Sequence, residues 1–301
     1  MSDLTRQQIE TGLAKLGDRL HLVNLGDGAR WRQHLKDITP DQLAVMLEQL
    51  PGAPSITLST DPQITTKSSP ELNLKVKAQD YHLRVILRPG ELHLLDLQVR
   101  PQKNGQSIAR QLIAWMVDFA ACAPQLKEED KTPRISTAAG LTNGAYTWAR
   151  FGFTPHASSS PDIQGWSELK QAIRRVRLSA DSARIAYDPV NLEACEFTAD
   201  SPYMRQHPKG FELTAEEQAA IQNALDSDDP KALWVISDLG RVVAPCHHPA
   251  SPITVGKAIL CGLSWVGEVR LDARDPGYQR LMAYLEPVRQ QTYKMEGARG
   301  I

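Results

Sequence analysis

The segment from Glu91 to Ser107 constrains the fold most, because it predicts a strand, a short loop and the first turn of a helix in direct succession. The strand, Glu91–Val99, alternates leucines and a valine with polar residues, as a partly buried strand does. From Ser107 to about Ala123, apolar residues recur at spacings that place them on one helical face. The connecting loop, Gln102–Ser107, contains one glycine, Gly105.

This loop has the features of a phosphate-binding turn. A glycine allows the backbone N–H groups to turn toward one point, and the following helix adds unpaired amides and the positive end of its dipole. The loop lacks the Gly-Lys-Ser/Thr ending of a Walker loop, and it has one glycine where a dinucleotide fingerprint has three. The residues expected to form the cradle are Gln102, Lys103, Asn104, Gly105, Gln106 and Ser107.

The loop resembles the acyl-CoA loop of the GNAT superfamily of N-acyltransferases. The family signature, Gln/Arg-x-x-Gly-x-Gly/Ala after a strand, corresponds here to Gln102-x-x-Gly105-x-Ser107, with serine as the last small residue. The segment from Asn143 to Phe153 is similar to the family's ending, in which an asparagine opens a helix that closes with an aromatic residue and Gly-Phe. Three predicted strands, 72–78, 81–87 and 91–99, form a meander like the one that precedes the family's loop.

The resemblance implies an α/β (α+β) fold with a mixed, mostly antiparallel central sheet flanked by helices. A GNAT-like acyl-CoA-binding domain is expected over residues 1–155, and residues 156–301 are expected to form a C-terminal extension or a second small α/β domain. Local signals add helices over 4–16 and 39–50, the second with the Thr39-Pro40 start typical of a capped helix, and a first strand over 55–59. Thr214 with Glu217 predicts a capping box, and a last helix is expected from Pro276.

The activity implied by the resemblance is transfer of an acetyl group from acetyl-CoA to an amine, either a protein lysine or N-terminus or a small amine. A backbone N–H near Val99 would stabilise the developing oxyanion. The asparagine of the motif, Asn143, would contact the pantetheine arm or stabilise the loop. The competing hypothesis is a non-catalytic module that keeps the acyl-CoA cradle and acts as a sensor or a protein-interaction domain.

The general base is sought along the 91–99 strand among Glu91, His93 and Asp96, and the last two are the main candidates. Strand alternation predicts that His93 shares a face with Leu95 and Leu97, whereas Asp96 lies on the opposite face. A histidine flanked by leucines is also consistent with a partly exposed structural residue, and Asp96 is equally able to hold a neighbouring loop.

The general acid is where the sequence departs from the family. The position of the family's tyrosine holds Trp148, which has no acidic proton to give, and this feature favours the non-catalytic alternative. Tyr146 is the nearest candidate, but it lies about 200° around a helix from that position and cannot simply replace it. Trp148, Phe151 and Phe153 are expected in the core.

Charge and hydropathy limit the partners and the compartment that we expect for this protein. The 34 basic and 35 acidic residues nearly balance, so no nucleic-acid partner is expected. No apolar run reaches the length of a membrane span, and no secretory signal precedes the first helix, so a cytoplasmic protein without a membrane partner is expected. The 143–153 segment also resembles bacterial effector- or toxin-type GNAT proteins, which leaves export by a signal-independent route open.

No metal is expected either. The run Cys246-His247-His248 contains potential metal ligands. Adjacent residues rarely bind one ion, however, and no second ligand pair with zinc-like spacing accompanies them. The four cysteines include no Cys-x-x-Cys pair, so reduced thiols are expected.

Overall fold

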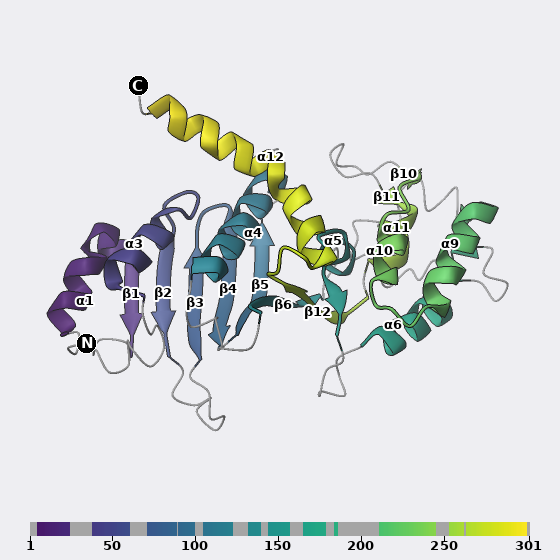
Figure 1. The fold of residues 1–301 in the computed structure, drawn as a ribbon, viewed down its shortest axis with the longest axis horizontal. Helices are drawn as coiled ribbons and strands as arrows, with labels where there is room; N and C mark the ends of the chain where they lie inside the picture. The colour runs from purple at the N-terminus through teal and green to yellow at the C-terminus, as the bar shows by residue number, and fades with distance from the viewer. Residues whose placement is uncertain are drawn as a thin grey trace. The chain divides into compact units, whose positions relative to one another are not determined.

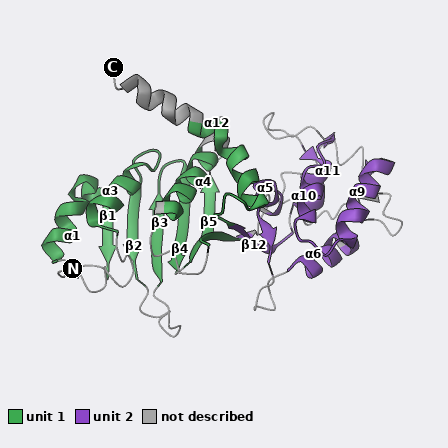
Figure 2. Cartoon of the chain, viewed as in Figure 1, with its two compact units in different colours: residues 1–137, 270–301 green, residues 138–269 purple. Residues whose placement is uncertain are grey.

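The computed structural model describes residues 5–24, 38–60, 71–88, 90–99, 105–122, 132–139, 144–156, 165–178, 184–185, 211–244, 253–261 and 263–299. The chain divides into two compact units, residues 1–137 with 270–301 and residues 138–269 (Figure 2). The expected boundary at residue 155 is not where these units divide. The C-terminal helix belongs to the first unit, and residues 138–155 belong to the second.

The first unit contains most of one β-sheet and the helices that pack on it (Figure 1). Its elements in chain order are α1 (Arg6–Leu13), a 3-10 turn (Ala14–Arg19), β1 (Leu20–Val23), α3 (Pro40–Glu48), β2 (Ser55–Ser59), β3 (Leu72–Lys77), β4 (Tyr81–Arg88), β5 (Glu91–Val99), α4 (Gly105–Cys122), β6 (Arg134–Ala139, whose last two residues fall in the second unit) and α12 (Pro276–Arg299).

The sheet is mixed and mostly antiparallel, as expected. Strands β2, β3, β4 and β5 form an antiparallel meander, and β1 and β6 add parallel pairs to β2 and β5. The prediction that Ser55–Ser59 is the first strand was wrong, because β1 precedes it. Strand β1 has only four residues and no fully buried side chain, so its sequence lacks the apolar alternation that marks the other strands.

The described helices cover one face of this sheet. Leucine, isoleucine and valine side chains of β2–β5 are buried on that face. Helix α4 packs against β5, and the indole N–H of Trp115 on α4 donates to the carbonyl of Met46 on α3 at 2.7 Å. Helix α12 joins α4 through Arg289, which is bonded to Asp118. The first unit is therefore a layer of helices on a sheet whose other face carries polar side chains.

Strand β5 contains a β-bulge at Leu95. Arg84 of β4 pairs with Asp96, and the next residue, Val85, pairs with Leu94, so Leu95 is an extra residue on β5. Its side chain is 40% exposed. The bulge shifts the alternation of the strand by one residue, because two successive residues then oppose one on the partner.

The second unit is built from short helices and strand pairs. Its elements are α5 (Gly144–Arg150), β7 (Thr154–Pro155), α6 (Trp166–Ala172), a π-helical turn (Ile173–Arg177), β8 (Arg184–Ile185), β9 (Phe211–Glu212), α9 (Ala215–Asp226), α10 (Ala232–Ser237), β10 (Val242–Ala244), β11 (Ile253–Thr254), α11 (Val255–Leu260) and β12 (Trp265–Arg270). Strand β12 pairs with β7, β10 with β11, and β8 with β9, all antiparallel.

Helix α5 ends in a Schellman motif. The N–H of Phe153 donates to the carbonyl of Trp148, and the N–H of Gly152 donates to the carbonyl of Ala149, both at 3.1 Å. Gly152 has φ 89°, the left-handed conformation that this cap requires. The rings of Trp148 and Phe153 pack with centroids 5.0 Å apart, which supplies the hydrophobic contact of the motif. Trp148 is 7% exposed, which confirms its predicted place in the core.

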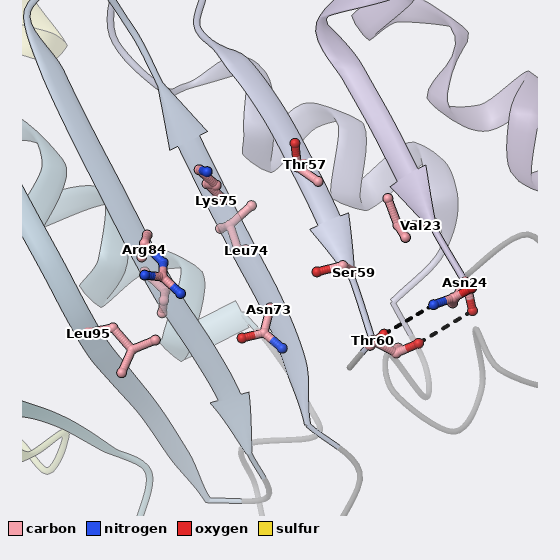
Figure 3. Close-up of a pocket in the computed structure, with 11 residues that line it drawn as sticks. Val23, Asn24, Thr57, Ser59, Thr60, Asn73, Leu74, Lys75, Arg84 and Leu95 are labelled. Carbon is pink, nitrogen blue, oxygen red and sulfur yellow. Dashed lines mark hydrogen bonds between the residues drawn. The ribbon is translucent and has the colours of Figure 1, made fainter. Parts of the chain in front are cut away.

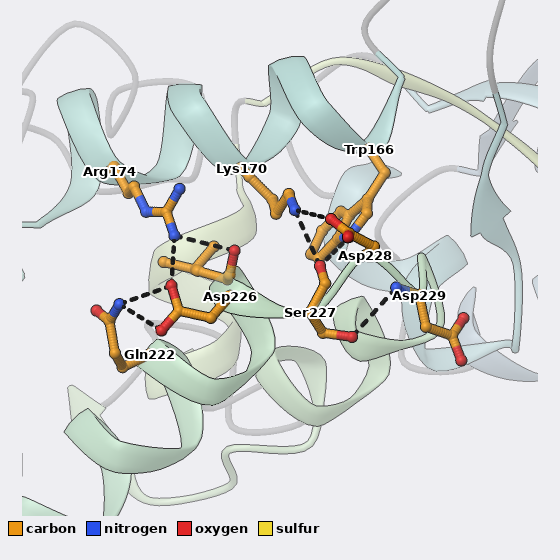
Figure 4. A network of polar contacts seen from close by, with 9 residues as sticks. Trp166, Lys170, Arg174, Gln222, Asp226, Ser227, Asp228 and Asp229 are labelled. Atoms are coloured by element: carbon orange, nitrogen blue, oxygen red, sulfur yellow. Dashed lines mark hydrogen bonds and ion pairs between the residues drawn. The ribbon is translucent and has the colours of Figure 1, made fainter.

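Cationic side chains of α6 and the π-helical turn cap the C-terminal end of α9 (Figure 4). Lys170 Nζ donates to the carbonyl of Ser227 at 2.9 Å, and Arg174 donates to the carbonyl of Leu225 and to Asp226, each at 2.9 Å. Cations at a helix C-terminus satisfy orphan carbonyls and complement the dipole. The structure therefore gives Arg174 a structural role at the end of α9.

Replacement of Gly152 by alanine is expected to destabilise the second unit by about 1 kcal/mol, because a Cβ is unfavourable at this φ. The measurement is urea unfolding followed by tryptophan fluorescence. Gly240→Ala is the matched control, since Gly240 is exposed and an added Cβ would make only ordinary contact there. Equal midpoints for the two variants would contradict this account of the cap.

Candidate functional site

A chain of hydrogen bonds joins β5 and β6 where the two strands run parallel. Nδ1 of His93 lies 2.7 Å from Oγ of Ser136, and the Ser136 hydroxyl donates to Glu91. Arg134 donates to the second oxygen of Glu91 at 3.2 Å. Ser136 is 2% exposed, and His93 and Glu91 are half-buried.

The direction of these hydrogen bonds fixes the tautomer of the histidine. An ionised carboxylate only accepts, so the Ser136 hydroxyl gives its proton to Glu91 and its oxygen accepts from His93. The proton of neutral His93 therefore sits on Nδ1. This leaves Nε2 with a lone pair, which is the form of imidazole that acts as a base.

Burial sets the charge state of this cluster. Desolvation lowers the pKa of His93, opposed by the neighbouring Glu91 carboxylate. Burial also disfavours ionisation of Glu91, but the Ser136 hydrogen bond and the Arg134 charge outweigh it, so the pKa of Glu91 lies below its usual range. Near neutral pH the cluster consists of a neutral imidazole, a hydroxyl and a carboxylate paired with a guanidinium.

Asp96 lies on the same face of β5 as His93, and the prediction of opposite faces was wrong. The bulge at Leu95 is the reason, because it shifts the alternation between the two residues. Asp96 bonds Nδ1 of His82 at 3.0 Å and accepts from the side-chain amide of Gln98 at 3.2 Å. Its carboxylate is thus already held by two neighbours.

The far half of β5 has a free edge within the described part of the chain. Strand β6 pairs with β5 only from Glu91 to Leu94, opposite Arg134 to Thr137, although β5 continues to Val99. Beyond Leu94, β4 is the one strand among the described residues that pairs with β5. Backbone groups that point away from β4 are therefore available to an extended ligand that adds to the sheet.

The structure describes only some of the residues that were predicted to bind acyl-CoA. Val99 ends β5 and is half-buried opposite Tyr81. Helix α4 begins at Gly105, two residues earlier than predicted, so Gly105, Gln106 and Ser107 form its first turn. Their amides belong to the set that has no partner within a helix. Gln102, Lys103, Asn104 and Asn143 lie outside the described residues.

Tyr146 belongs to the second unit, whereas Asp96 and His93 belong to the first. Its hydroxyl accepts from Arg150 at 3.1 Å and from the Thr254 hydroxyl at 3.4 Å. Thr254 is the N-cap of α11, so these contacts link α5 to α11. They give Tyr146 a structural role within the second unit.

Sequence reasoning missed Ser136 as a site residue. The available signal was a serine next to Ile135 in the short segment Arg134–Ala139, which forms β6. A buried hydroxyl requires a partner. The parallel register of β5 and β6 pairs Ser136 with His93, and that register was not read from the sequence.

The other charged contacts of the described residues have structural roles. Arg241 holds Glu217 through two hydrogen bonds of 2.7 Å and thereby lowers the pKa of this carboxyl, which also closes the capping box of α9 with Thr214. Among the described residues, no three metal-binding side chains gather at one place, and no helix is long and apolar enough to cross a membrane. The run Cys246-His247-His248 lies outside them.

Comparisons of the chain with protein-family models, with curated proteins and with solved structures gave no match.

The lowered pKa of His93 predicts a pH-dependent stability. Below about 6.5, the ordinary value, the unfolded chain binds a proton at His93 that the folded chain refuses. The free energy of unfolding therefore decreases as the pH falls from about 6.5 through the folded pKa of His93. Above pH 6.5, the stability is retained in full. NMR titration should give His93 a midpoint below that of a histidine in an unfolded peptide.

The matched comparison is His93→Gln, which should lose less stability than the wild type between pH 7 and pH 5. The resonance that is missing from the NMR spectrum of this variant identifies the signal of His93. A His93 midpoint above 6.5 would contradict the burial argument.

Proposed function

We propose that this chain is an acyl-CoA-dependent N-acyltransferase that moves an acetyl group from acetyl-CoA to an amine. The observation that carries the proposal is the edge of β5 beyond Leu94, where β6 no longer pairs and a bulge interrupts the ladder. An extended pantetheine arm can add to this edge as a strand would. The first turn of α4, which begins at Gly105, supplies amides for the pyrophosphate.

The same edge supports the chemical step. Backbone N–H groups between Leu95 and Val99 that do not point to β4 are candidates to stabilise the thioester oxyanion. Holding the amine and the thioester together on one strand supplies much of the acceleration, because a bimolecular step becomes effectively unimolecular. The resemblance of the loop to the GNAT signature adds support from the sequence.

We assign the general base to His93. Its Nε2 takes the proton from the attacking amine while the nitrogen forms a bond to the acyl carbon. The C–S bond then breaks, and CoA leaves as a thiolate that takes a proton from solvent. Ser136 and Glu91 are positioning residues, which hold the proton on Nδ1. Asp96, already bonded to His82 and Gln98, is the second candidate for the base.

A non-catalytic acyl-CoA-binding module is the alternative. The observation that favours it is the burial of Trp148 against Phe151 and Phe153, since this position then offers no acid to the leaving thiolate. Such a module would bind acetyl-CoA without releasing a thiol in the presence of any amine.

Gly105→Asp is expected to abolish acetyl-CoA binding, since it brings a side chain and a negative charge to the pyrophosphate cradle. Isothermal titration calorimetry with acetyl-CoA measures this. Gly240→Asp makes the same change at an exposed glycine of the second unit and should leave the affinity unaltered. Unchanged affinity in Gly105→Asp would refute the proposed cradle.

His93→Gln is expected to lower kcat for amine acetylation about 10²-fold or more, with little change in the Kd for acetyl-CoA. Release of CoA thiol, followed with a thiol reagent, measures kcat. His21→Gln is the control, because His21 is exposed on β1 in the same unit. If turnover in His93→Gln matches the wild type while Asp96→Asn is slow, the base is Asp96.

A further inference from the structure

A shallow pocket of about 300 Å³ opens on the polar face of the sheet (Figure 3). Strands β1 to β5 all contribute to it. Its polar side chains are those of Asn24, Thr57, Ser59, Thr60, Asn73, Lys75 and Arg84. The bulged residue of β5, Leu95, forms part of its wall, which brings the pocket to the strand edge proposed to hold the acyl donor.

The pocket concentrates positive charge. Lys75 and Arg84 occupy directly paired positions on β3 and β4, and none of the described residues that line the pocket is acidic. Like charges at paired positions of an antiparallel sheet are destabilising. An anion bound between them would remove that repulsion.

Within the described part of the chain, neither cation has a protein partner. The register places Asp96 opposite Arg84, but the Asp96 carboxylate bonds His82 and Gln98 instead. Arg88, the next cation along the same face of β4, does have a partner, since it bonds Glu71 at 2.8 Å. Lys75 and Arg84 are thus the two described cations of the pocket, and no ion pair among the described residues of this face neutralises either of them.

We propose that Lys75 and Arg84 bind the anionic group, a carboxylate or a phosphate, of the acceptor amine. This inference rests on the proposed acyl transfer. Both groups are planar or tetrahedral oxyanions that a guanidinium and an ammonium recognise, and the hydroxyl and amide side chains of the pocket add neutral donors.

The spacing suits a small acceptor. His93 pairs with Ile86, two residues from Arg84 along β4. With a rise of about 3.4 Å per residue and about 4.8 Å between strands, the backbones of Arg84 and His93 lie roughly 8 Å apart on one face. One small molecule can therefore present its amine to His93 and its anionic group to the pocket. The substrate class is an amino acid or an amine that carries a phosphate.

The test compares matched amines with and without an anionic group: phosphoethanolamine against ethanolamine, and β-alanine against ethylamine. Acetyl transfer is measured by thiol release with acetyl-CoA. We expect kcat/KM to be at least tenfold higher for the anionic member of at least one pair, and the pair that responds distinguishes phosphate from carboxylate. Equal rates within both pairs would overturn the inference.

Lys75→Gln and Arg84→Gln should each lower kcat/KM for the preferred anionic amine about tenfold and leave the neutral amine unaffected. Lys77→Gln is the control, because Lys77 is exposed two residues further along the same face of β3 and does not line the pocket. A rise in the Kd for acetyl-CoA in the two variants would instead assign the pocket to the phosphates of CoA and overturn the inference.

Calorimetry with phosphoethanolamine and β-alanine alone separates this inference from the proposed function. Binding that is lost in Lys75→Gln, without turnover of any amine, would refute the acyl transfer and leave the anion pocket standing. Acetyl transfer that does not depend on Lys75 or Arg84 would refute the anion pocket and leave the proposed acyl transfer standing.

Discussion

The β-bulge at Leu95 is the local constraint on which the candidate site depends. Without the extra residue, the alternation of β5 would place Asp96 and His93 on opposite faces. With it, the polar residues Glu91, His93 and Asp96 share one face, whereas Leu92, Leu94 and Leu97 pair with buried residues of β4 on the other. The bulge also interrupts the ladder at the point where β6 stops pairing. One inserted residue thus sets which side chains share the polar face, and it lies where the described pairing of β5 with β6 ends.

The ion pairs of this face leave a definite charge pattern. Its described carboxylates are all bonded to neighbours: Glu71 to Arg88, Glu91 to Arg134 and Ser136, and Asp96 to His82 and Gln98. Lys75 and Arg84 are left as the positive centre of the pocket. Lys75 and Arg84 are two cations beside the one carboxylate of Asp96, and this excess of positive charge favours an incoming anion.

Much of the first unit could be predicted from sequence because its signals are local. Turn residues and apolar alternation gave β3, β4 and β5 within one residue, and the capping residues Thr39 and Thr214 gave the starts of two helices. The adjacent leucines Leu94 and Leu95 break the alternation of the strand, and this local sign of the bulge was not used. The pairing of Ser136 with His93 depends on the register between β5 and β6, which leaves no local trace. The division into units was missed for a similar reason, because α12 joins the first unit through contacts with α4 far away in the sequence.

The Schellman motif of α5 changes how the sequence resemblance should be weighed. An aromatic residue followed by Gly-Phe is what a helix needs when it ends with a left-handed glycine and a hydrophobic contact across the cap. Trp148, Gly152 and Phe153 meet that need within the second unit. This part of the resemblance therefore has a sufficient explanation in helix capping. Capping accounts for neither the strand edge of β5 beyond Leu94 nor the two cations at directly opposite positions of β3 and β4.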